Sequence, residues 1–195
     1  MRFVRSGSVL FAALALLPAC KMAQNVRPAQ IGDWRINGQS NAMLSSQDGG
    51  DLGDKDTLRL GASAGRFVAD GWMLEGIGTL EATKEEDSAG NDRDVTIFTV
   101  GAGARYYFDT QSTTRPYAAV QGGIASIDLD DDATGIDDSD TAPFARLAGG
   151  VELFLNDNVS VDLGVAFERI FDLEIVDVSD DLTTISGYVG LSVWL

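Results

Sequence analysis

The sequence contains no histidine, and Cys20 is its only cysteine. Histidine is the commonest general base of enzymes, and the usual Ser-His and Cys-His nucleophile systems depend on it. A pair of carboxylates could take over this role only if a motif held them together, and the sequence shows no such motif. We therefore expect a protein that is not an enzyme and has no organic cofactor. A single cysteine also excludes an intrachain disulfide.

Positive charge and proline are scarce as well. The chain has 14 lysines and arginines against 30 acidic residues, a net charge of −16, and no basic patch follows Arg27. Such a surface repels nucleic acid and attracts cations, so we expect no nucleic-acid partner. The apolar content of 45% argues against disorder, and 22 glycines with only 4 prolines favour strands and turns. A length of 195 residues favours one domain.

No apolar run is long enough to cross a bilayer as a helix. An apolar run at residues 9–17 follows a short basic start, which is the pattern of a secretory signal peptide, and we assign residues 1–19 to it. The run ends in Leu17-Pro18-Ala19-Cys20, which resembles the lipobox of bacterial lipoproteins except at Pro18. Lipidation of Cys20 and ordinary signal peptidase cleavage are two alternatives for the processing of this signal. Both imply that the chain is exported.

The remaining chain alternates apolar and polar residues with a period of two, which is typical of strands with one apolar face. Residues 96–108 set the pattern: Phe98, Val100, Ala102, Ala104, Tyr106 and Phe108 share one face, opposite Thr99, Gly101, Gly103, Arg105 and Tyr107. The same split recurs in residues 34–44, 58–64, 72–81, 117–128, 145–155, 159–167 and 182–195. We therefore predict eight strands of about ten residues or more, the length that a tilted strand needs to cross the hydrocarbon.

The predicted connections alternate in length. Residues 47–56, 84–94, 129–140 and 174–181 are long and acidic, whereas residues 69–71, 109–115 and 156–158 are shorter. Long loops outside and short turns on the periplasmic side are expected for a transmembrane barrel with an even strand number. We accordingly predict that both termini are periplasmic, with a linker at residues 20–30 and the barrel at residues 31–195.

A soluble, lipocalin-like barrel is the alternative explanation of the alternation. Such a barrel would place its apolar faces inward and its charges outward, and it would be a lipoprotein anchored through Cys20 alone. The polar faces here carry single arginines and glutamates among glycines, while the opposite faces are almost uniformly apolar. This distribution favours the transmembrane barrel, whose strands close on themselves because no backbone edge can face lipid.

Two segments carry a family resemblance. Gly101-Ala102-Gly103-Ala104-Arg105-Tyr106-Tyr107-Phe108 and Arg115-Pro116-Tyr117-Ala118-Ala119-Val120-Gln121-Gly122-Gly123 resemble the small outer-membrane β-barrel domains of the OmpA/OmpX/OmpW-like porin family. The resemblance covers about residues 32–195. The C-terminus also resembles the assembly signal of these barrels, although Trp194 is penultimate where the family normally ends in an aromatic residue. The resemblance implies a Gram-negative outer-membrane protein and identifies a fold more than an activity.

Charged residues on the predicted inner face are the main candidates for a functional site. An eight-stranded lumen is just wide enough for side chains, and unpaired charges there would be costly, so these residues are expected to form an ion-pair network. The network would comprise Arg35, Arg59, Glu75, Glu81, Arg105, Arg146, Glu152, Asp162 and Glu168. It could plug the lumen, or it could line a gated path for ions or small solutes, and plugging is the reading we favour.

The acidic segment at residues 128–135 contains a second candidate site. Asp128, Asp130 and Asp132 resemble the start of a Ca²⁺-binding loop, but a glycine at the sixth position and an acid at the twelfth are missing. Diffuse attraction of divalent cations is the simpler expectation.

The sequence thus predicts an eight-stranded, antiparallel, up-and-down transmembrane β-barrel, monomeric and surrounded by outer-membrane lipids. Its predicted role is structural, or a surface interaction through acidic loops. A narrow channel for ions or small solutes and a soluble barrel lipoprotein are the alternatives.

Overall fold

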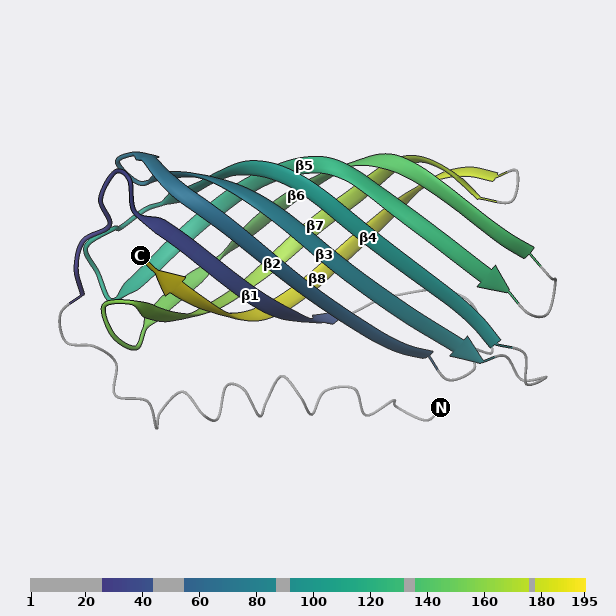
Figure 1. The fold of residues 1–195 in the computed structure, drawn as a ribbon, viewed down its shortest axis with the longest axis horizontal. Coiled ribbons are helices and arrows are strands. Elements are labelled where there is room, and N and C mark those ends of the chain that lie inside the picture. Colours follow the sequence, from purple (N-terminus) through teal and green to yellow (C-terminus); the bar gives the residue numbers. More distant parts are fainter. Residues whose placement is uncertain (1–25, 44–54, 87–91, 132–135, 176–177) are drawn as a thin grey trace.

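The chain forms a closed barrel of eight antiparallel strands, in which sequence neighbours pair and β8 pairs back with β1 (Figure 1). The computed structural model describes residues 26–43, 55–86, 92–131, 136–175 and 178–195. The strands are β1 (Trp34–Met43), β2 (Lys55–Ala69), β3 (Trp72–Glu86), β4 (Asp92–Tyr107), β5 (Thr114–Asp131), β6 (Ile136–Phe154), β7 (Val159–Ile175) and β8 (Val178–Trp194). The predicted all-β, up-and-down barrel is confirmed. In the described ranges there is no helix with the length and apolarity to cross a membrane.

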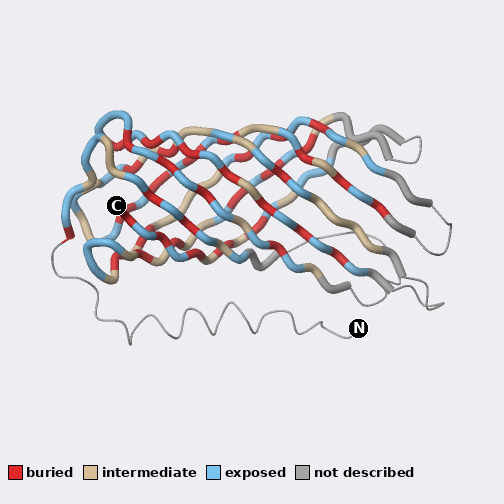
Figure 2. The backbone as a smooth tube through the Cα atoms, viewed as in Figure 1, coloured by how far each residue is buried: buried red, intermediate tan, exposed pale blue. Residues whose placement is uncertain are grey.

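The barrel wall is apolar on the outside and polar on the inside. Leu147 and Leu191 on the outer face are each 59% exposed, whereas Arg35 on the inner face is fully buried. Figure 2 shows this alternation of exposed and buried residues along every strand. The soluble-barrel alternative required the opposite arrangement, and this finding rules it out.

The outer face of β3 shows how the strand length matches a bilayer. Its outward residues are apolar or small from Trp72 to Ala82 and end at the exposed Lys84. This stretch has the roughly 9–11 residues that a tilted strand needs to cross the hydrocarbon. Trp72 packs against Tyr106 with ring centroids 4.9 Å apart, which forms an aromatic belt at one end of the apolar band.

At the opposite end, the strands continue well past the apolar band, so the predicted extents of the long loops are wrong. Residues 129–140 were expected to be a loop, but β5 runs to Asp131, β6 begins at Ile136, and these two residues pair. Likewise, β7 runs to Ile175 and β8 begins at Val178. Strand pairing depends on backbone hydrogen bonds and therefore continues into acidic segments, whereas hydropathy marks only where lipid contact ends. We call this end of the barrel the long-strand end.

The other end, which we call the short-turn end, carries tight turns and the C-terminus (Figure 1). Gly71 turns the chain between β2 and β3 with a φ of 73°, a conformation that favours glycine. The backbone amides of Gln111 and Ser112 donate to Asp109 Oδ1 at 2.8 and 3.1 Å, which closes the turn between β4 and β5. Side-chain acceptors of this kind are what short turns require.

Residues 26–33 lie across the short-turn end. Val26 is buried in the cluster of side chains that fills this end, and Ala29 N donates to Thr110 O at 3.1 Å. The guanidinium of Arg115 donates to Arg27 O at 2.6 Å. Part of the predicted linker therefore packs against the barrel mouth.

Candidate functional site

The nine charged residues predicted to face the lumen all do so, and each is buried. They come from six strands: β1 supplies Arg35, β2 Arg59, β3 Glu75 and Glu81, β4 Arg105, β6 Arg146 and Glu152, and β7 Asp162 and Glu168. In each strand the residue lies at an inward position of the alternation, and closure of the barrel brings the six strands around one lumen. The structure divides the nine residues into two clusters.

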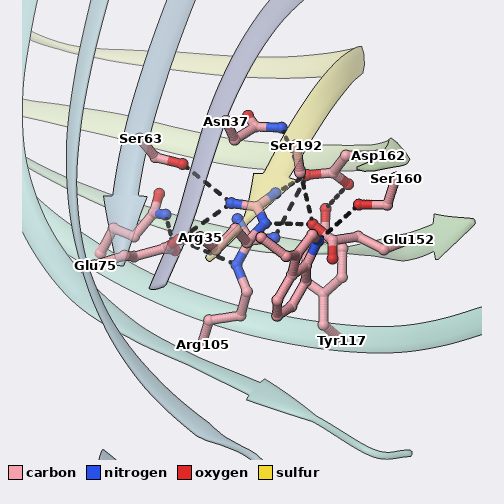
Figure 3. Close-up of polar contacts among 12 residues, drawn as sticks. Arg35, Asn37, Ser63, Glu75, Arg105, Tyr117, Glu152, Ser160, Asp162 and Ser192 are labelled. Atoms are coloured by element: carbon pink, nitrogen blue, oxygen red, sulfur yellow. Dashed lines mark hydrogen bonds and ion pairs between the residues drawn. The ribbon is translucent and has the colours of Figure 1, made fainter. Parts of the chain in front are cut away.

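The first group, the Arg35 cluster, consists of Arg35, Glu75, Arg105, Glu152 and Asp162 (Figure 3). Arg35 lies at its centre, because its Nε donates to Glu152 and its Nη2 donates to Asp162 Oδ2 at 2.6 Å. Arg105 Nε donates to Glu75 Oε2 at 3.1 Å. Each arginine therefore contacts more than one carboxylate, which is the arrangement that offsets the cost of burying these charges.

Neutral side chains complete the Arg35 cluster. The hydroxyl of Tyr117 donates to Asp162 Oδ1 at 2.6 Å and also contacts the hydroxyl of Tyr188. Gln121 Nε2 donates to Glu75 Oε1 at 2.6 Å, and Ser192 Oγ donates to Glu152 Oε1 at 3.1 Å. None of these four residues belongs to the predicted lumen network. The alternation places each of these four residues on the inner face. A polar residue at an inward position was therefore the sequence signal that could have identified them.

The second group, the Arg59 cluster, consists of Arg59, Glu81, Arg146 and Glu168. Arg59 contacts Glu168 at 2.6 Å and Glu81 at 3.5 Å. Arg146 pairs with Glu168 in the strand register and lies 5.7 Å from the ring centre of Tyr188. Within the described part of the chain, however, Arg146 Nε and Nη1 and Glu168 Oε2 have no hydrogen-bond partner. The Arg59 cluster is therefore less completely paired than the Arg35 cluster.

Apolar side chains close the lumen on both sides of the charges. At the short-turn end, Phe67, Tyr107, Tyr117, Phe154 and Trp194 form a cluster with ring centroids 5.2–5.8 Å apart. Arg115 lies over Phe154 at 4.1 Å and is a buried inward charge that is missing from the predicted lumen network. Toward the long-strand end, the second core cluster comprises Ile77, Ala125, Ile127, Ala142, Phe144 and Ile170.

Glycines on the inner face provide the space for these rings. A Cβ added at Gly164 would lie 2.5 Å from Tyr188 Cζ, and one at Gly101 would lie 2.9 Å from Phe144 Cζ. Such distances are too short for carbon atoms in contact, so each ring occupies the volume that the missing side chain leaves free. The barrel wall and these two rings are therefore closely packed.

The predicted Ca²⁺ ligands do not share a loop. Asp128 and Asp130 belong to β5, and alternate Cα atoms of a strand are about 6.6 Å apart along it, so the backbone does not curl around an ion. Asp132 lies outside the described residues, as does Cys20. Over the residues that the structure describes, no three His, Cys, Asp or Glu side chains are grouped so that they could hold a metal ion.

Several solved structures share this architecture. Neisserial surface protein A aligns with a TM-score of 0.63 and 22% identity, covering 83% of this chain and 96% of that one. The attachment invasion locus protein Ail of Yersinia pestis aligns with a TM-score of 0.56 and 17% identity, covering 85% of this chain and 100% of Ail. OprG of Pseudomonas aeruginosa gives 0.57 and 15%, with 87% and 99% covered. At these identities the likeness shows the fold.

The sequence comparison identifies the family. No curated protein matches the chain in sequence. The family model for the outer membrane protein β-barrel domain, in contrast, matches residues 9–193. This match covers nearly the whole chain and agrees with the closed barrel and its apolar outer wall. The chain belongs to the outer membrane protein β-barrel domain family.

Proposed function

We propose that this protein is a sealed outer-membrane scaffold, neither a channel nor an enzyme, which presents its acidic long-strand end to the cell surroundings. The observation that carries the proposal is the filled lumen. Aromatic side chains occupy one end, two clusters of buried charges follow, and a second apolar cluster packs beside the Arg59 cluster and extends toward the long-strand end. Eight-stranded barrels are just wide enough for side chains to fill them.

Opening such a lumen would be costly. A path for ions would require Arg35 or Arg105 to leave carboxylates with which they are in direct contact. Breaking a buried ion pair by removing one partner costs roughly 3–5 kcal/mol, because the other charge stays buried without compensation. The same pairing supports a structural role for the carboxylates in preference to a catalytic one.

The orientation follows from the proposed export signal and the even strand number. The short-turn end, where the C-terminus and residues 26–33 lie, faces the periplasm, and the long-strand end faces outward. The backbone at this outer end pairs Asp130 with Asp137 and Leu129 with Asp138. Asp128 is exposed there. Charge of this density attracts cations and repels anionic polymers.

The name of one structurally similar protein supports a surface-interaction role. Ail, one of the similar structures, is named for attachment and invasion, and it has also been crystallised with the heparin analogue sucrose octasulfate. This chain has a net charge of −16, so we propose cationic partners for it, such as divalent ions or basic surfaces, and not a polyanion.

The test is conductance of the full chain in planar bilayers. Closure is first verified on gels, where a folded barrel migrates differently from a boiled sample. We expect no discrete openings from the heat-modifiable protein. The double variant Arg35→Ala, Glu152→Ala, which removes the centre of the Arg35 cluster, serves as the comparison and should leak. Stable openings of the folded wild type would overturn the sealed scaffold and favour the narrow channel.

A further inference from the structure

Small residues form a continuous row on the outer wall across β2 to β5, which lie side by side (Figure 1). The strand register aligns Ala64 with Gly76, Gly76 with Ala102, and Ala102 with Gly122. The neighbouring row contains larger residues, because Arg66 aligns with Leu74, Leu74 with Ala104, and Ala104 with Val120. The small row is therefore lower than the wall beside it.

This difference in side-chain size produces a groove of about 1000 Å³. Its outward-facing lining consists of Trp34, Ala64, Arg66, Val68, Leu74, Gly76, Ala102, Ala104, Val120 and Gly122. Arg66 is the one charged residue among these outward-facing lining residues. The groove is shallow and wide open on its outer side. Because the groove lies within the apolar band, its row of small residues can accommodate an acyl chain.

Arg66 gives the groove a charged end. Its side chain is exposed, it lies next to Trp34 in the register, and its guanidinium is 5.8 Å from the centre of the Trp34 ring. Its Nε donates to Gly32 O at 3.3 Å, which with the Trp34 contact orients the side chain along the wall. Among the described residues Arg66 has no ion pair, and its Nη1 and Nη2 make no hydrogen bond.

Arg66 lies one register row inside the aromatic belt of Trp72 and Tyr106. A guanidinium at this depth extends toward the headgroup region, where its free nitrogens can bind a phosphate in a bidentate manner. Because Arg66 is already oriented by its contacts with Gly32 and Trp34, binding a phosphate costs less conformational entropy.

We propose that this groove is a binding site for one anionic glycerophospholipid, with its phosphate on Arg66 and an acyl chain over Gly76 and Ala102. Charge complementarity favours this occupant over a second copy of the chain. The outward-facing side chains of the groove include no carboxylate, so a second copy placed on the same wall would bring arginine toward arginine. A phosphate neutralises the charge and leaves the apolar groove to the acyl chain.

The proposal is tested by native mass spectrometry of the full chain in detergent, titrated with phosphatidylglycerol or with a diacylglycerol of the same acyl chains. The wild type should bind phosphatidylglycerol about tenfold more tightly, a difference of about 1.4 kcal/mol, because the guanidinium of Arg66 can donate hydrogen bonds to the phosphate. Arg66→Gln should bind both lipids equally. Lys84→Gln removes an exposed cation outside the groove and should behave like the wild type.

Two outward-facing glycines of β3 allow the contact with the acyl chain to be tested by a matched pair of variants. An added Cβ would lie 3.9 Å from its nearest neighbour at Gly76 and 3.8 Å at Gly78, so both positions accept a side chain, but only Gly76 lines the groove. Gly76→Leu should weaken the binding of both lipids about tenfold, whereas Gly78→Leu should not. Heat modifiability verifies that each variant is folded.

Unchanged phosphatidylglycerol binding by Arg66→Gln would overturn the proposal, as would equal binding by the two glycine variants. A dimer that Gly76→Leu abolishes and lipid does not displace would also overturn it and assign the groove to a second copy. None of these results depends on whether the lumen conducts.

Discussion

The Arg35 cluster and the Arg59 cluster use the same residue types inside the same lumen, yet they differ in how completely their polar atoms are paired. In the Arg35 cluster, both arginines contact two or more carboxylates, Tyr117 and Gln121 donate to further carboxylate oxygens, and Glu152 Oε2 is the one carboxylate oxygen among the described residues of the cluster that is buried without a hydrogen-bond partner. In the Arg59 cluster, Arg146 has two buried nitrogens without a hydrogen-bond partner in the described chain. Burial alone therefore does not fix a charge in place, and the surrounding partners decide whether it stabilises the barrel.

The largest effect is expected from Arg35→Met. This change leaves Glu152 and Asp162 buried without their central partner, so the free energy of unfolding should fall by about 3–5 kcal/mol. Equilibrium urea unfolding in lipid vesicles, followed by tryptophan fluorescence, measures the loss. A variant as stable as the wild type would show that the cluster fills space without holding the wall together.

A smaller effect is expected from a pair of buried tyrosines. The hydroxyl of Tyr117 donates to Asp162, whereas the hydroxyl of Tyr107 has no partner among the described residues. Tyr117→Phe should cost about 1.5–3 kcal/mol in urea unfolding, and Tyr107→Phe should be neutral or stabilising. Equal losses in both variants would contradict the pairing described for the Arg35 cluster.

Arg146→Met sharpens the comparison between the clusters. Methionine fills a similar volume, Glu168 keeps its contact with Arg59, and the main loss is the contact of Arg146 with the Tyr188 ring. We expect a loss of about 1 kcal/mol or less. If thermal unfolding places this variant level with Arg35→Met, the two clusters are energetically equivalent and the comparison fails.

The smallest effect is expected from Asp128→Asn at the long-strand end. Asp128 and Asp130 follow an extended strand, so Ca²⁺ should associate diffusely with the acidic surface and not at one site. Isothermal titration should show no saturable step for the wild type or for this variant. A stoichiometric step that Asp128→Asn removes would restore the specific Ca²⁺ site.

The alternation alone predicted much of the fold. It assigned Phe98, Leu147 and Leu191 to the lipid side and Arg35, Arg105 and Glu152 to the lumen, as observed. The strand ends were harder to predict, because β5 and β6 keep pairing through acidic residues that hydropathy assigns to a loop. The inward polar residues Tyr117 and Tyr188 were not named as site residues, because the sequence does not show which carboxylate a phenol reaches.

The sequence by itself determined the strand count, the face of each residue in the predicted strands and the resemblance to the family, because side chains alternate along any strand regardless of its neighbours. Only the tertiary structure decided which charges meet. Arg35 on β1 bonds Glu152 and Asp162, which are 117 and 127 residues away in the chain. These contacts depend on the register of each strand pair and on the closure of β8 against β1, and a one-residue shift in register would turn every side chain of a strand to the opposite face.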